Sequence, residues 1–149
     1  ESASNVSRHN YDNSPISQCP PRQLIHTGKG IDIIEVERIR ASYEKFGERF
    51  THRILLPAEI EYCLRHKNPA PFLAARFAAK EAITKAFGTG ITAELGWHDM
   101  EIARRETGAP YVILHGKGKE LLKARGGSNI HISLSHTAHQ ATAMAILEG

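Results

Sequence analysis

Apolar residues in residues 35–50 recur at alternating steps of three and four, which is the spacing of an amphipathic helix. The apolar positions are Val36, Ile39, Tyr43, Phe46 and Phe50. On a second face of this helix, Arg38, Lys45 and Arg49 lie seven and eleven residues apart and project in nearly the same direction. The pattern therefore predicts a helix with an inward apolar stripe and an outward basic ridge.

The rest of the chain alternates less regularly between strand and helix patterns. Residues 24–34 end in a β-branched run and predict a strand interrupted near Gly28 and Gly30. Pro57 opens a short helix, and residues 72–87 predict a longer one that Gly88 ends in the left-handed conformation. The remaining predicted elements are a hairpin (100–104 with 111–115), a short helix (119–124) and a second hairpin (130–134 with 141–147). Separate runs of strands and helices indicate an α+β fold with a mainly antiparallel sheet.

Composition limits the class of protein. With 149 residues, 41% hydrophobic and 23% charged, the chain has the size and balance of one globular domain, and no apolar run reaches the length of a membrane span. Cys19 and Cys63 indicate no disulfide framework, so we expect a cytoplasmic protein. Residues 1–23 are rich in Ser, Asn and Pro and lack a secretion-signal pattern. We expect an extension there and a single domain over residues 24–149.

Two carboxylates are candidates for metal chemistry. Asp32 lies within an apolar strand, where a charged group needs a partner or a metal, although it also suits a helix N-cap. Glu81 borders the apolar face of helix 72–87, although Glu81 and Lys85 also have the spacing of an ordinary exposed ion pair. Carboxylates from two distant elements suit magnesium, which keeps positions for water and phosphates. We therefore hypothesise that Asp32 and Glu81 form one magnesium site together.

Basic residues and glycines near the same helix suit a phosphorylated ligand. The charge of +3 favours anionic partners without choosing among them. Each of these residues alone is more simply explained as a solvated basic face or a helix cap. His136, at a strand end, is a candidate for a phosphate contact or for proton transfer. The candidates are Arg76, Lys80, Lys85, Gly88, Thr89 and His136.

Five blocks, in order, resemble the holo-acyl-carrier-protein synthases, a family of 4′-phosphopantetheinyl transferases. The blocks are Gly28-x-Gly30-Ile31-Asp32 with Arg38-Ile39, Phe50-x-x-Arg53 with Glu59, residues 74–90 (AARFAAKEAITKAFGTG), Gly108-x-Pro110, and Ser133-Leu134-Ser135-His136-Thr137. The likeness runs from about residue 27 to the C-terminus. Residues 1–23 have no family counterpart, and Gln140 replaces a usual aromatic residue.

The resemblance implies transfer of 4′-phosphopantetheine from coenzyme A to a serine of an apo acyl carrier protein. It implies that Asp32 and Glu81 bind Mg²⁺, while the general base stays open between Asp32, Glu81 and a metal-bound water. It also implies that the six candidates above line the coenzyme A site and that the ridge of Arg38, Lys45 and Arg49 binds the carrier. The resemblance to short members of the family further implies a homotrimer with shared active sites.

Two other functions fit parts of the sequence. A basic module that binds nucleic acid or an acidic protein would use the ridge, but acidic residues interrupt this helix and aromatic residues make up only 7% of the chain. A metal-dependent hydrolase of nucleotide pyrophosphates would use the same ion with water as nucleophile. We therefore expect neither nucleic-acid nor membrane binding, and rank the transferase first.

Overall fold

A computed structural model describes residues 26–149 of the chain. The predicted extension, residues 1–23, lies outside the described residues. The elements in chain order are β1 (His26–Glu35), α1 (Val36–Phe46), α2 (Glu48–Ile54), α3 (Pro57–Leu64), α4 (Ala70–Phe87), the 3₁₀ turn η1 (Trp97–Asp99), β2 (Met100–Arg104), β3 (Pro110–Leu114), α5 (Lys117–Ala124), β4 (Asn129–His136) and β5 (Gln140–Glu148).

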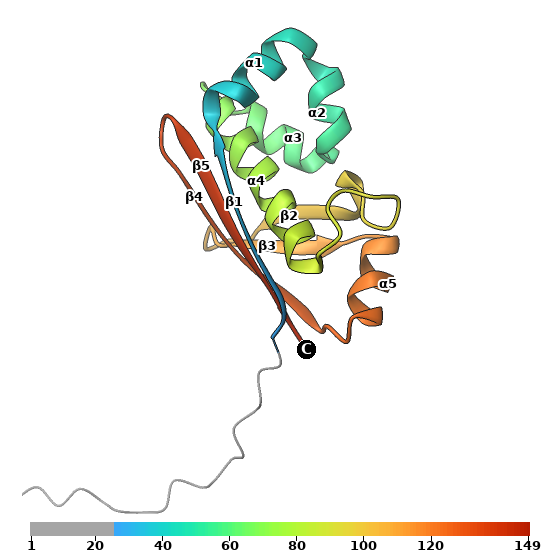
Figure 1. Cartoon of the computed structure of the whole chain (residues 1–149). Coiled ribbons are helices and arrows are strands. Elements are labelled where there is room, and N and C mark those ends of the chain that lie inside the picture. The colour runs from blue at the N-terminus through green and yellow to red at the C-terminus, as the bar shows by residue number, and fades with distance from the viewer. Residues whose placement is uncertain (1–25) are drawn as a thin grey trace, which may run out of the picture.

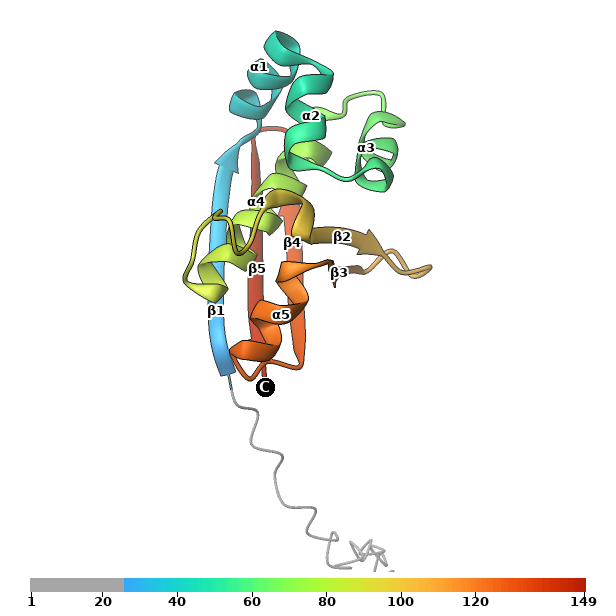
Figure 2. The ribbon, with the colours of Figure 1, turned by 90° about the vertical axis from the view of Figure 1, so that its right-hand side faces the viewer.

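Two antiparallel sheets organise these elements. The larger sheet has the strand order β1-β5-β4, and β2 with β3 forms a separate hairpin. The helices lie on one side of the larger sheet, and α4 runs along this side of β1 and β5 (Figures 1 and 2). The predicted α+β class with antiparallel strands is confirmed.

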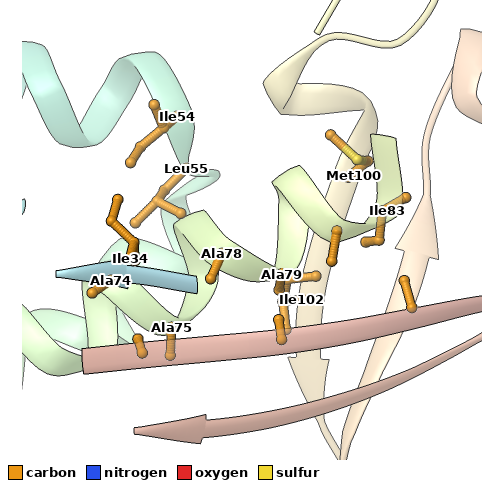
Figure 3. Close-up of a cluster of buried hydrophobic side chains, with 14 of the residues drawn as sticks. Ile34, Ile54, Leu55, Ala74, Ala75, Ala78, Ala79, Ile83, Met100 and Ile102 are labelled. Carbon is orange, nitrogen blue, oxygen red and sulfur yellow. The ribbon is translucent and has the colours of Figure 1, made fainter. Parts of the chain in front are cut away.

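Small residues bring α4 unusually close to β1. A Cβ atom added at Gly30 would lie 2.0 Å from the carbonyl oxygen of Ala82, and one at Gly28 would lie 2.0 Å from that of Ala86. On α4, alanines such as Ala75 and Ala79 lie in the buried cluster shown in Figure 3. The helix backbone therefore packs directly on the strand, which sets the distance between side chains of β1 and α4 at the site described below.

The predicted interruption of the first strand is confirmed beside Gly28 but not at Gly30. β1 continues through Gly30, and its only register shift against β5 lies between His26 and Gly28. Both glycines also allow the close packing of β1 against α4.

The predicted helix over residues 35–50 is also wrong, because the structure divides it at Gly47. This residue has φ 56° and ψ −129°, donates its N–H to the carbonyl oxygen of Tyr43 at the end of α1, and precedes α2. Such a positive φ favours glycine over residues with a side chain, so the chain turns there. Arg38 and Lys45 lie on α1, whereas Arg49 lies on α2. The predicted single ridge is therefore distributed over two helices.

The outer face of the larger sheet carries exposed apolar side chains. Ile31 and Ile33 on β1 are 66% and 64% exposed, and Met144 on β5 is 46% exposed. None of the described helices covers this face (Figure 1). Among residues 26–149, no helix has the length and apolar character needed to cross a bilayer.

Candidate active site

Asp32 and Lys85 meet where β1 packs on α4. The Lys85 Nζ atom lies 2.8 Å from Asp32 Oδ1 and donates a second hydrogen bond of 3.0 Å to the carbonyl oxygen of Ile31. The Asp32 side chain is only 15% exposed, whereas that of Lys85 is 51% exposed. The inward position of Asp32 follows from strand alternation, since its neighbours Ile31 and Ile33 point to the open face.

Glu81 lies one helical turn before Lys85 and interacts electrostatically with both Asp32 and Lys85. Burial raises the pKa of the Glu81 carboxyl, the negative charge of Asp32 raises this pKa further, and Lys85 opposes both effects. Among the described residues, the Glu81 carboxylate makes no hydrogen bond or ion pair. The two predicted metal-binding carboxylates are therefore near neighbours, brought together from elements 49 positions apart in the sequence.

Lys80 has a different environment, with no exposed surface to offer a ligand. Its side chain is 0% exposed, and its Nζ atom donates hydrogen bonds to Glu59 Oε1 (2.7 Å) and to the carbonyl oxygens of Ile54 (2.7 Å) and Trp97 (3.0 Å). Burial lowers the pKa of Lys80, against the attraction of Glu59. These contacts occupy all three donors of the ammonium group, so the geometry gives no support to the predicted contact with coenzyme A.

Glu59, the partner of Lys80, is a buried residue whose role no local sequence pattern predicted. Glu59 is buried and also accepts hydrogen bonds from the backbone N–H groups of Leu56 (2.9 Å) and Ile102 (3.0 Å). It stands at the third position of α3, where an acid that accepts a hydrogen bond from the preceding backbone is an ordinary helix-start signal. That local signal does not reveal the long-range partners on α4 and β2.

Arg76 forms the centre of a cationic cluster on Tyr62. Its side chain is buried, its Nε atom has no hydrogen-bond partner among the described residues, and its Cζ atom lies 4.0 Å from the centre of the Tyr62 ring. Arg65 and Arg104 lie at 4.9 and 5.2 Å from the same ring. Among the described residues, none of these three arginines is paired with an acid, so the cluster suits an anionic group.

His136 lies at the end of β4 and extends this aromatic cluster. Its ring meets Phe72 edge-on at 5.1 Å, and Phe72 in turn stacks on His66 at 3.6 Å. His136 itself is exposed. The predicted contacts His136 and Arg76 therefore belong to one connected group of rings and guanidinium groups.

Gly88 and Thr89 end α4 and use their backbone amides there. Gly88 has φ 75°, as the predicted left-handed cap requires, and donates its N–H to the carbonyl oxygen of Lys85 at 3.0 Å. Thr89 donates its N–H to that of Thr84 at 3.1 Å. These two amides point to the helix end instead of to a ligand, which does not support the expectation that they meet a phosphate.

A groove lies at the corner between α1 and α2. It has a volume of about 580 Å³ and is lined by Ser42, Phe46, Arg49, Phe50 and Arg53. Phe46 is 46% exposed, and the Lys45 ammonium lies 5.2 Å from the centre of its ring. Cationic groups therefore border an apolar groove that is separate from Asp32 and Glu81.

The site combines two neighbouring carboxylates with a lysine where α4 packs on β1, which suits a protein that acts on a phosphorylated substrate. Residues 28–144 match the family model of the 4′-phosphopantetheinyl transferase superfamily. The chain belongs to this family.

Curated relatives and solved structures agree with this assignment. The chain is 49% identical over 121 residues to the holo-acyl-carrier-protein synthase of Koribacter versatilis and 50% identical to that of Maridesulfovibrio salexigens, with 81% of this chain and 97% of each relative covered. The synthase structure from Neisseria meningitidis matches with a TM-score of 0.79 at 33% identity, covering 84% of this chain and 100% of that one. The structure of the Helicobacter pylori synthase in complex with coenzyme A matches with a TM-score of 0.72 at 34% identity, covering 80% of this chain and 98% of that one.

Proposed function

We propose that this chain transfers 4′-phosphopantetheine from coenzyme A to a serine of an apo acyl carrier protein. The products are the holo carrier protein and adenosine 3′,5′-bisphosphate. The observation that carries the proposal is the convergence of Asp32 and Glu81, with Lys85 against Asp32, in a chain that covers nearly all of relatives named as synthases. A solved relative binds coenzyme A.

Asp32 and Glu81 fit a magnesium site. Within residues 26–149, no group of three or more His, Cys, Asp or Glu residues has the arrangement of a metal cage. Magnesium does not require one, because it commonly binds one or two carboxylates and completes its shell with water and substrate phosphates. Burial and the negative charge of Asp32 raise the pKa of Glu81, and this proximity of like charges also favours a cation between the two groups. When bound, the ion would neutralise charge on the pyrophosphate of coenzyme A.

Each side chain then has a task in the transfer. The serine oxygen of the carrier forms a bond to the β-phosphorus of coenzyme A, and the bond from that phosphorus to the oxygen bridging to the α-phosphorus breaks. Asp32, Glu81 or a water held by them accepts the serine proton. Lys85 supplies positive charge for the phosphates directly, and the buried Arg76 on Tyr62 adds positive charge at longer range. Lys80 acts indirectly, because its bonds to Glu59 hold α4 in place.

The α1–α2 corner is the proposed docking surface for the carrier protein. Arg38, Lys45 and Arg49 are exposed, and none of them forms an ion pair with a described residue. Unpaired cations beside the apolar groove suit an acidic helix with an apolar side chain, and such charges accelerate association.

We further propose that the enzyme is a cytoplasmic homotrimer with shared active sites. The uncovered face bearing Ile31, Ile33 and Met144 supports an assembly, because exposed apolar patches of this kind mark protein interfaces. Ile31 and Met144 of this face line a hollow together with Lys85, so a neighbouring chain that covers the face would approach the site.

The decisive experiment incubates the protein with magnesium and coenzyme A, with and without an apo carrier protein, and follows the intact mass of the carrier and the release of nucleotide. If the protein is a transferase, nucleotide is released and the carrier gains mass only when the carrier is present. Nucleotide release without carrier would instead indicate a hydrolase. The variants Asp32→Ala and Glu81→Ala should each lose transfer by on the order of 100-fold or more while remaining folded. Glu120→Ala, which removes an exposed carboxylate on α5, is the matched control.

A further inference from the structure

Lys85 and a divalent cation require the same carboxylate. The Lys85 ammonium lies 2.8 Å from Asp32 Oδ1, and the carbonyl oxygen of Ile31 accepts a second of its three protons. Two cations close to one carboxylate repel each other, so a bound cation weakens the contact of the ammonium group with Asp32. Lys85 also acts on Glu81 electrostatically, but among the described residues its ammonium group makes a direct contact only with Asp32 of these two carboxylates.

Lys85 has freedom to move away from Asp32. Its side chain is 51% exposed and has a flexible four-carbon stem. Beside it lies a hollow of about 480 Å³, lined by Lys29, Gly30, Ile31, Lys85 and Met144. A phosphate group in this hollow would attract the ammonium group away from Asp32.

We propose that Lys85 competes with the divalent cation for Asp32, and that phosphates of coenzyme A remove this competition by attracting the Lys85 ammonium group. The proposal rests on the metal site proposed above. Because binding linkage is reciprocal, the cation in turn frees Lys85 for the phosphates. Lys85 thereby couples the binding of the cation to that of coenzyme A, in addition to contacting the phosphates.

The test measures binding of Mn²⁺ alone, by electron paramagnetic resonance of the free ion at low salt without coenzyme A. Lys85→Met should bind Mn²⁺ roughly two- to fivefold more tightly than the wild type, in line with the strength of a partly exposed ion pair. Lys85→Arg retains the charge and should not show this gain. Lys29→Met is the matched control, because it removes a charge from the same hollow without removing a contact to Asp32. The gain in Mn²⁺ affinity of Lys29→Met should be less than half of the gain in Lys85→Met.

The second measurement repeats the titration with saturating coenzyme A. The tightening of Mn²⁺ binding that coenzyme A causes should be smaller in Lys85→Met than in the wild type, because the competitor is already absent. Unchanged or weaker Mn²⁺ binding by folded Lys85→Met without coenzyme A would overturn the proposal. If Asp32→Ala binds Mn²⁺ as tightly as the wild type does, the metal site itself is contradicted. The two failures are therefore distinguishable.

Discussion

Two lysines of α4, five positions apart, form ion pairs of nearly the same length and have opposite surroundings. Lys80 Nζ lies 2.7 Å from Glu59, and Lys85 Nζ lies 2.8 Å from Asp32. The Lys80 and Glu59 side chains are 0% and 1% exposed, whereas Lys85 is 51% and Asp32 15% exposed. Five helical positions separate the two side chains by about 140° around the axis, so they point toward different parts of the molecule.

The difference shows that burial, and not the ion pair itself, separates a structural lysine from a functional one. A pair without exposed surface cannot exchange partners, and the loss of one member leaves a charge in the interior. A pair at the surface contributes little to stability and is free to bind a ligand or an ion. The α4 sequence presents both lysines in one block, which is why sequence analysis assigned both to the cofactor.

The comparison predicts that Lys80→Met is strongly destabilising. Without its partner, Glu59 would remain charged in the interior, and the free energy of unfolding should fall by about 3–5 kcal/mol. Urea denaturation measures this loss. The double variant Lys80→Met/Glu59→Leu removes both charges and should recover part of the stability, although the N–H groups of Leu56 and Ile102 lose their acceptor. A loss below about 1 kcal/mol in the single variant would place Lys80 in the exposed class.

Lys85→Met should show the opposite profile. Its unfolding free energy should change by less than about 1 kcal/mol, because the pair is partly exposed. The Michaelis constant for coenzyme A should rise about tenfold, which is the loss expected for a charge-assisted hydrogen bond. Steady-state kinetics and urea denaturation on the same preparation decide the case. A stability loss as large as that of Lys80→Met would remove the distinction between the two lysines.

The α1–α2 corner adds a third kind of cation, one without an acid partner. Reversing Lys45 or Arg49 to Glu should raise the Michaelis constant for the carrier protein by roughly threefold at low salt and leave that for coenzyme A unchanged. Wild type and variants should converge at high salt, since the Debye length falls from about 10 Å at 0.1 M to about 3 Å at 1 M. Lys119→Glu on α5 is the matched control. An altered constant for coenzyme A would instead place these residues at the cofactor.

Local signals account for what sequence analysis predicted correctly. The predicted span 72–87 corresponds to α4, because strong helix formers precede a glycine in the left-handed conformation. Both hairpins form where alternating strands flank turns. The errors arise from one local backbone conformation and from contacts between distant residues. Gly47 follows an apolar pattern that continues past it, and only its backbone conformation reveals the turn. Glu59 lies 21 positions before Lys80, so no periodicity connects the two.

The smallest predicted effect concerns Glu81, whose pKa is raised by burial and by Asp32. In the folded protein its ionised form is therefore disfavoured, and Glu81→Gln should stabilise the chain by about 0.5–1 kcal/mol at pH 7 without magnesium, as is common at functional sites. The sign follows from proton linkage. Between the ordinary Glu pKa of 4.5 and the raised value, the folded wild type binds more protons than the unfolded chain, so its stability falls as pH rises through this window. Below pH 4.5 both states carry the proton, and the advantage of the variant should vanish.

Urea denaturation at pH 7 and pH 4 measures the difference. Added magnesium should stabilise the wild type more than the variant, because it binds the folded carboxylates. If Glu81→Gln is no more stable than the wild type at pH 7, the crowding of Asp32 and Glu81 is not a source of strain in the folded site.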